Sequence, residues 1–184
     1  RIALLMVCGL VSSGVYWFAF ATSYSLRRLT PLGGPADIGL LTDYSPRACA
    51  LYTAALVALF ALYLAAVYLG QDVSARSGYA IVFGLGIVAA GVLCMVYPYA
   101  ASDVFLYIAR GRVLGVYGQN SLVIPPDRFP IESYVPFPSE WTAMASPYGP
   151  LWEWVAAGLA RLGDGNLLRS LFTFKVFGLF TYVG

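Results

Sequence analysis

The sequence predicts an all-α integral membrane protein, a polytopic helical bundle with about five spans and one long extracytoplasmic loop. Hydrophobic residues make up 60% of the 184 residues and charged residues only 11%, whereas a soluble domain carries roughly 25% charged residues. The mean hydropathy is +0.74. Uncharged segments of 24 to 26 residues recur, and about 20 apolar residues are enough for a helix to cross a bilayer. The composition therefore excludes a soluble globular protein and a disordered one.

Three segments are predicted to be membrane-spanning helices, because each is apolar, uncharged and longer than a bilayer-crossing helix needs to be. They are residues 2–26, 48–71 and 77–102. Alanines recur at helical spacing in the second segment, at positions 54, 58, 61 and 65. Small residues let helices approach closely, so this stripe is expected to form a contact between helices.

Two further segments, residues 150–162 and 167–184, are predicted to be weaker spans. The first carries Glu153, and the second carries Arg169 and Lys175. A charged side chain at membrane depth has to face protein or water. Neither helix is therefore expected to face lipid on all sides.

The composition also restricts the chemistry. The chain has no histidine and a net charge of +2, so it lacks the commonest general base and zinc ligand and the basic surface that binds nucleic acid. Its cysteines, Cys8, Cys49 and Cys94, lie apart in apolar segments and are expected to be free thiols. Any reaction must use carboxylates, tyrosines, arginines or the single lysine.

The 45 residues from 103 to 147 form the predicted functional loop, because long ordered loops between spans usually carry function. The loop holds four acids: Asp103, Asp127, Glu132 and Glu140. Their spacing matches no metal motif, so no cofactor or metal is expected, with a divalent cation on these carboxylates as the alternative. We expect this loop outside the cell, because the shorter loops with Arg1 and Arg76 have the higher density of basic residues.

An amphipathic helix on the membrane surface is predicted over residues 103–116, because Pro98 should end or kink the preceding span. One face is apolar at Leu106, Ala109, Val113 and Val116, and Asp103, Tyr107 and Arg110 share another face. A carboxylate can take a proton, and a guanidinium can bind phosphate. The pair would suit a substrate with a hydroxyl and a phosphate leaving group. Alternatively, Ser102 or Asp103 caps the helix, and Arg110 and Arg112 contact lipid headgroups.

Three more residues are candidates for substrate binding. Asn120 lies in the turn that ends the predicted helix. Tyr148 stands in Ser-Pro-Tyr-Gly-Pro-Leu-Trp at residues 146–152, a rigid helix start that either only stiffens the chain or offers a platform to a sugar or lipid phosphate. Lys175 lies in the middle of the last apolar segment, where a charge indicates function. It would either pair with Glu153 or bind phosphate.

Taken together, the motifs between residues 97 and 152 resemble those of the polyprenol-phosphate-mannose-dependent mannosyltransferases, which belong to the GT-C class of membrane glycosyltransferases. The resemblance rests on two pieces of sequence. They are Ser-Asp-Val-Phe-Leu-Tyr at residues 102–107, with Gly111, and Ser-Pro-Tyr-Gly-Pro-Leu at residues 146–151. The chain departs from the family pattern after Asn120, where Ser121 and Leu122 stand in place of Pro-Tyr, and at Glu153 in the fourth span.

The resemblance implies a membrane glycosyltransferase that moves a sugar, with mannose favoured, from a polyprenyl-phosphate carrier to an acceptor hydroxyl with inversion. It implies that Asp103 is the catalytic base. The candidate substrate-binding residues are Tyr107, Arg110, Asn120, Tyr148 and Lys175. The expected partners are that donor, a glycan or lipid acceptor and the bilayer of the cell membrane. The alternatives are a polytopic transporter or lipid flippase, and a non-catalytic membrane scaffold.

The ends of the chain suggest its place in a larger protein. Residue 1 is Arg rather than Met, and the last apolar run is still open at residue 184. We therefore interpret residues 1–184 as the N-terminal part of a transmembrane glycosyltransferase domain.

Overall fold

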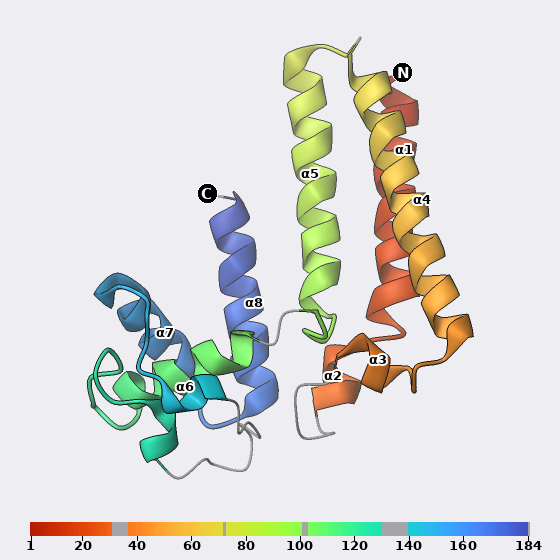
Figure 1. Cartoon of the computed structure of the whole chain (residues 1–184). Coiled ribbons are helices and arrows are strands. Elements are labelled where there is room, and N and C mark those ends of the chain that lie inside the picture. Colours follow the sequence, from red (N-terminus) through yellow and green to blue (C-terminus); the bar gives the residue numbers. More distant parts are fainter. Residues whose placement is uncertain (31–36, 72, 101–102, 130–139, 184) are drawn as a thin grey trace. The chain divides into compact units, whose positions relative to one another are not determined.

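The structure, a computed structural model, describes residues 1–30, 37–71, 73–100, 103–129 and 140–183. This part of the chain is helical, with one isolated antiparallel bridge between Ser25 and Val96. The helical elements are α1 (Ile2–Val15), η1 (Tyr16–Ala21), α2 (Leu26–Leu29), α3 (Ile38–Leu41), α4 (Pro46–Gly70), α5 (Ala75–Cys94), α6 (Asp103–Gly115), η3 (Pro126–Arg128), η4 (Glu140–Ala143), α7 (Pro150–Leu162) and α8 (Leu167–Val183) (Figure 1).

The chain forms two compact units. The first consists of Arg1–Leu26, Gly39–Tyr97 and Leu179–Gly184, and the second of Arg27–Ile38 and Pro98–Gly178.

Three helices of the first unit are long and apolar enough to cross a membrane. They are the continuous helix of α1 and η1, with 20 residues, α4, with 25, and α5, with 20. Three of the five predicted spans are thus present as candidate spans. Two serines are accommodated inside α1 because Ser12 and Ser13 donate to carbonyl oxygens one turn earlier, at 2.8 and 3.0 Å.

Two of these helices end earlier than predicted. The first ends at Ala21 rather than at position 26, and the third ends at Cys94 rather than at position 102. Beyond these ends the two segments pair with each other, and the Tyr97 N–H donates to the Tyr24 carbonyl at 2.7 Å. Pro98 explains the early end of α5, because the residue before a proline avoids the helical conformation.

The alanine stripe of α4 does not form the predicted contact. Positions 54, 58, 61 and 65 are exposed, whereas Ala55 is buried. The ring of Tyr52 also packs against that of Phe20, with 5.5 Å between the ring centroids. A different face of α4 therefore packs on the first helix. The apolar pattern could not choose between these faces, because a helix that is apolar all round has no preferred one.

A cavity of about 560 Å³ lies among α1, α4 and α5. Its walls are mostly apolar, and the continuous helix of α1 and η1 contributes Cys8, Ser12 and Tyr16, which are spaced four residues apart. Concave apolar sites of this size are suited to an apolar ligand.

The second unit is built on a contact between α6 and α7, which lie side by side in Figure 1. Both glycines of α6, Gly111 and Gly115, face the α7 backbone. A methyl group added at Gly115 would lie 2.6 Å from the carbonyl oxygen of Ala157, and one added at Gly111 would collide with the carbonyl oxygen of Ala156. The two helices are therefore in backbone contact, which only glycine permits at these positions.

The helix α6 occupies the residues of the predicted amphipathic helix, but it is buried on more than one side. Its buried residues are Phe105, Ile108, Arg110, Gly111, Arg112, Val113 and Gly115. Both arginines that were expected to contact lipid headgroups or substrate are thus buried in the unit. The position of this helix on a membrane surface stays a prediction.

The helices α7 and α8 are short, with 13 and 17 residues. At a rise of about 1.5 Å per residue they measure about 20 and 26 Å, less than the hydrocarbon thickness of about 30 Å. Their assignment as spans therefore stays a prediction.

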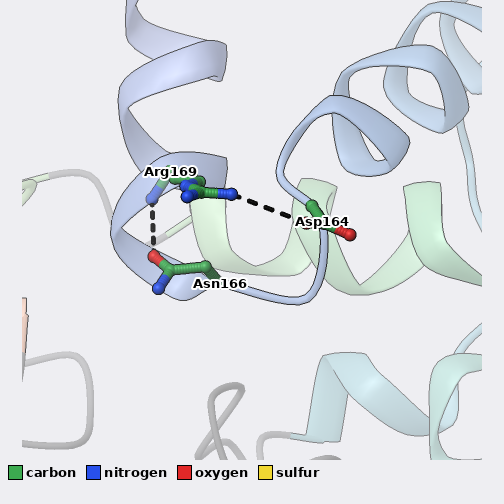
Figure 2. Close-up of polar contacts among 3 residues, drawn as sticks. All are labelled: Asp164, Asn166 and Arg169. Atoms are coloured by element: carbon green, nitrogen blue, oxygen red, sulfur yellow. Dashed lines mark hydrogen bonds and ion pairs between the residues drawn. The ribbon is translucent and has the colours of Figure 1, made fainter.

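A tight turn joins α7 to α8, and it includes two residues with positive φ, Asp164 at 48° and Gly165 at 68°. Figure 2 shows that Asn166 caps α8, since its side-chain oxygen accepts from the Arg169 N–H at 3.0 Å. The Arg169 guanidinium lies 3.5 Å from the Asp164 carboxylate, and both side chains are exposed. Such a pair contributes little stability. Arg169, which we expected within a span, lies in the exposed first turn of α8.

We expect Gly111→Ala to lower the stability of the second unit by about 1–3 kcal/mol, the usual range for overpacking a filled interface. Gly158→Ala is the matched control on α7, because none of the described residues places an atom within 4 Å of the added methyl group. It should be neutral, or stabilise by about 0.5–1 kcal/mol through helix propensity. Thermal unfolding of both variants checks this, and equal melting temperatures would contradict the proposed backbone contact.

Candidate functional site

The predicted base, Asp103, is the first residue of α6 and is exposed. A carboxylate in the first turn of a helix is favoured by the positive end of the helix dipole. Its charge acts on both Tyr107 and Arg110, which stand four and seven residues further along the helix. The three residues predicted to share one face are therefore coupled in the structure.

An aromatic cluster, defined as Tyr107, Tyr148, Trp152 and Phe177, joins α6 to the start of α7 and to α8. The Tyr107 ring stands edge-on to Tyr148 and Trp152, at centroid distances of 5.5 and 5.3 Å. The hydroxyl oxygens of Tyr107 and Tyr148 are 3.3 Å apart. Phe177 packs on Trp152 at 6.4 Å. Two of the predicted substrate-binding residues, Tyr107 of α6 and Tyr148 just before α7, are therefore in contact.

The Arg110 side chain lies beneath this cluster and is 2% exposed. Its Nη2 donates to the carbonyl oxygens of Trp141 and Met144, at 3.3 and 3.5 Å. Its guanidinium carbon is 5.9 Å from the centre of the Tyr148 ring, a distance at which a cation–π attraction acts. Among the described residues, its buried Nε has no hydrogen-bond partner.

Burial lowers the pKa of Arg110, because the charged guanidinium loses its hydration. Electrostatic interactions with Tyr148, Glu153, Tyr107 and Asp103 oppose this shift. The guanidinium is thus held in place as a buried cation, surrounded by groups that favour its charged form.

The hydrogen bond to Tyr148 and burial raise the pKa of Tyr107 to about 12, with smaller contributions from the charges of Tyr148 and Asp103. The phenol of Tyr107 is therefore neutral at any working pH. It can donate a hydrogen bond, but it is not a base.

The main site feature that the sequence did not predict is the environment of Glu153. This carboxylate lies in the first turn of α7 and is 2% exposed. One of its oxygens accepts from the Ser121 hydroxyl at 2.6 Å, and the other accepts from the Ser146 hydroxyl. Ser121 and Glu153 are two of the positions at which the sequence departs from the family pattern, and they contact each other. No signal in the sequence connects them.

The remaining predicted residues are placed differently. Asn120 is exposed, and its side-chain oxygen accepts from the Leu122 N–H at 3.0 Å, so it shapes its own turn. Lys175 is half-buried on α8, four residues from the buried Leu171. It does not share a helix face with Phe177, because residues two apart point to different sides. Residue Glu132 and the side chain of Glu140 lie outside the described part of the chain.

Within the described residues, no group of three or more acidic or cysteine side chains is arranged to hold a metal ion.

These features define a helical membrane protein whose loop helix presents a carboxylate, a buried arginine and aromatic side chains together. A family model described as alpha-(1->6)-mannopyranosyltransferase, N-terminal domain, matches residues 6–183. The chain belongs to this family, and it is therefore a mannosyltransferase, as the sequence motifs predicted. Comparisons with curated proteins and with solved structures gave no match.

We expect the difference in tyrosinate absorbance between the parent protein and Tyr107→Phe to titrate near pH 12 rather than near 10. The fold favours the protonated phenol, so its contribution to stability is complete below pH 10 and is lost as the pH rises through the folded pKa of about 12. Spectrophotometric titration measures this, with circular dichroism to show that the helices persist. A midpoint near 10 would contradict the hydrogen bond to Tyr148.

Proposed function

We propose that this mannosyltransferase takes mannose from a polyprenyl-phosphate carrier and transfers it to an acceptor hydroxyl, with Asp103 as general base. The observation that carries the proposal is that α6 holds the exposed carboxylate of Asp103 in its first turn and, further along, Tyr107 of the aromatic cluster and the buried Arg110. It supplies a base and a buried cation on one helix. Their separation along the axis is about 10 Å at 1.5 Å per residue, which suits a donor and an acceptor side by side.

The reaction proposed is a single displacement. The Asp103 carboxylate takes the proton from the acceptor hydroxyl, and that oxygen bonds to the anomeric carbon of mannose. The bond from this carbon to the phosphate oxygen breaks on the opposite face, so the anomeric configuration inverts. Phosphate leaves without being protonated, so no second carboxylate is needed as general acid. Holding the hydroxyl against Asp103 supplies much of the rate.

The leaving phosphate gains negative charge, which a fixed positive charge stabilises. We propose that Arg110 supplies it. Because its Nη2 is already bonded to two loop carbonyls and its side chain is buried, its proposed role is a fixed positive field rather than a direct contact with the phosphate. Lys175 is proposed as a second cation for the phosphate.

Two further features support the lipid-linked donor. The exposed Tyr148 ring, 39% accessible, is the kind of aromatic surface on which a sugar stacks. Separately, the apolar cavity among α1, α4 and α5 is of a kind that takes an apolar chain. A transporter or lipid flippase was the alternative from the sequence, and membership of a mannosyltransferase family favours the enzyme.

Asp103→Asn should lower mannose transfer by about 10²–10⁴-fold, the usual cost of losing a general base. Asparagine has the same size but cannot accept the proton, so donor binding and folding should be retained. The measurement uses the intact membrane protein and radiolabelled polyprenyl-phosphate mannose, with transfer and donor binding followed separately.

Asp127→Asn is the matched control for this change, because Asp127 is an exposed acid of the same loop, in η3. It should leave transfer at the parental rate. Parental turnover by Asp103→Asn would place the base elsewhere, with Glu132 and Glu140 as the next candidates. No transfer from this donor by the parent would refute the proposed carrier.

We propose that the loop from residue 103 to 147 is extracytoplasmic in the cell membrane. In a background without the three cysteines, a membrane-impermeant thiol reagent should label Gln119→Cys on intact cells. Gln71→Cys, in the turn between α4 and α5, should react only after the cells are broken. Both side chains are exposed, so either can be reached from its own side. The reverse pattern would reverse the orientation.

A further inference from the structure

Glu153 is a buried carboxylate, and burying a carboxylate costs free energy. Its place in the interior therefore needs an explanation. An ionised carboxylate loses far more hydration than it regains unless it is hydrogen-bonded. Exchanging a buried ionic group for an apolar one of similar size is often neutral or stabilising. At 2% exposure, with both oxygens bonded to serines, Glu153 also cannot reach an acceptor hydroxyl. It is therefore not a second base.

The bonds of Glu153 lead to Tyr148 in two steps. The Ser146 hydroxyl donates to one Glu153 oxygen, and the same hydroxyl oxygen accepts from the Tyr148 N–H at 3.3 Å. The Ser146 N–H in turn donates to the Ser121 carbonyl at 2.8 Å. The Glu153 N–H donates to the Gly149 carbonyl oxygen at 3.3 Å.

The serines that hold this turn in place are buried, whereas Tyr148, which the turn presents, is exposed. Ser121 and Ser146 are 1% and 8% accessible, whereas Tyr148 is 39% accessible. The Tyr148 ring contacts Tyr107 and lies over Arg110. Two prolines flank the turn and restrict its backbone, and the Ser146 N–H ties it to the Ser121 carbonyl. The carboxylate holds the Ser146 hydroxyl, which is the group that accepts from the Tyr148 N–H.

We propose that Glu153 is a positioning residue for mannosyl transfer, whose carboxylate acts through Ser146 to fix the turn that presents Tyr148 beside Tyr107 and Arg110. The inference deepens the proposed function, because it rests on the reaction taking place beside Asp103. The fixed Tyr148 ring would contact the sugar of the donor. A ring held by a buried network is pre-ordered before the sugar arrives.

The test compares Glu153→Gln with Ser146→Ala in the intact membrane protein. Both should lower kcat for mannose transfer by about 10²-fold, the cost of misplacing a reacting group by about 1 Å. Both should also move the Tyr107 titration from about pH 12 toward 10, because Tyr148 no longer holds the Tyr107 hydroxyl. In a Tyr148→Ala background neither change should lower kcat further.

Two variants serve as controls. Ser121→Ala removes the other hydroxyl from Glu153 and should lower the melting temperature while it keeps most of the turnover and the Tyr107 midpoint. Asp164→Asn removes an exposed acid of the same unit and should behave like the parent. If Glu153→Gln fails to fold, the kcat values of Ser146→Ala and Ser121→Ala test the proposal instead. Equal losses of kcat in these two variants would overturn it.

Parental kcat and an unchanged Tyr107 midpoint in folded Glu153→Gln would also overturn it, as would additive losses in the Tyr148→Ala background. The titration separates this inference from the proposed function, because it needs no donor. A parent that does not use polyprenyl-phosphate mannose refutes that donor, while the Tyr107 midpoint still supports or refutes the role of Glu153.

Discussion

The second unit depends on the backbone contact between α6 and α7. Gly111 and Gly115 let α6 approach the carbonyl groups of Ala156 and Ala157, closer than any side chain would allow. This approach brings Tyr107 and Arg110 to the turn that carries Tyr148. Without it, the motif of the loop helix and the motif of the α7 start would remain two separate pieces of sequence. The glycines are therefore as much a part of the site as the polar residues.

The charges of the site are fixed in a chain that is otherwise short of them. Arg110 and Glu153 are both buried, and each is held by hydrogen bonds to the loop between α6 and α7. A hydrogen-bonded charge in a low-dielectric environment exerts a stronger field than the same charge in water. The structure thus uses its few ionised side chains where they act on the aromatic cluster, and it leaves the Asp164–Arg169 pair exposed on the surface.

The fold could be predicted where composition decides it. Uncharged apolar runs gave the three long helices, and the i, i+4, i+7 spacing placed Asp103, Tyr107 and Arg110 on one helix. The family resemblance was confirmed. What failed was the choice of packing face on α4, because apolar residues surround that helix and no period marks one side. The partners of Glu153 could not be predicted either, since a serine in a loop gives no sign of which distant carboxylate it will contact. Lys175 and Asn120 remain candidates by position alone.

The dependence of α6 on α7 also bears on the order in which the protein is made. α6 has 13 residues, with Gly111 inside it and Gly115 at its end. Isolated helices below about 12–15 residues are marginal in water, and an interior glycine costs about 1 kcal/mol. A ribosome releases α6 before α7, so the loop helix leaves the exit tunnel before its docking surface exists. We therefore expect the site to assemble only after α7 has emerged, with α6 and α7 folding together as one cooperative unit.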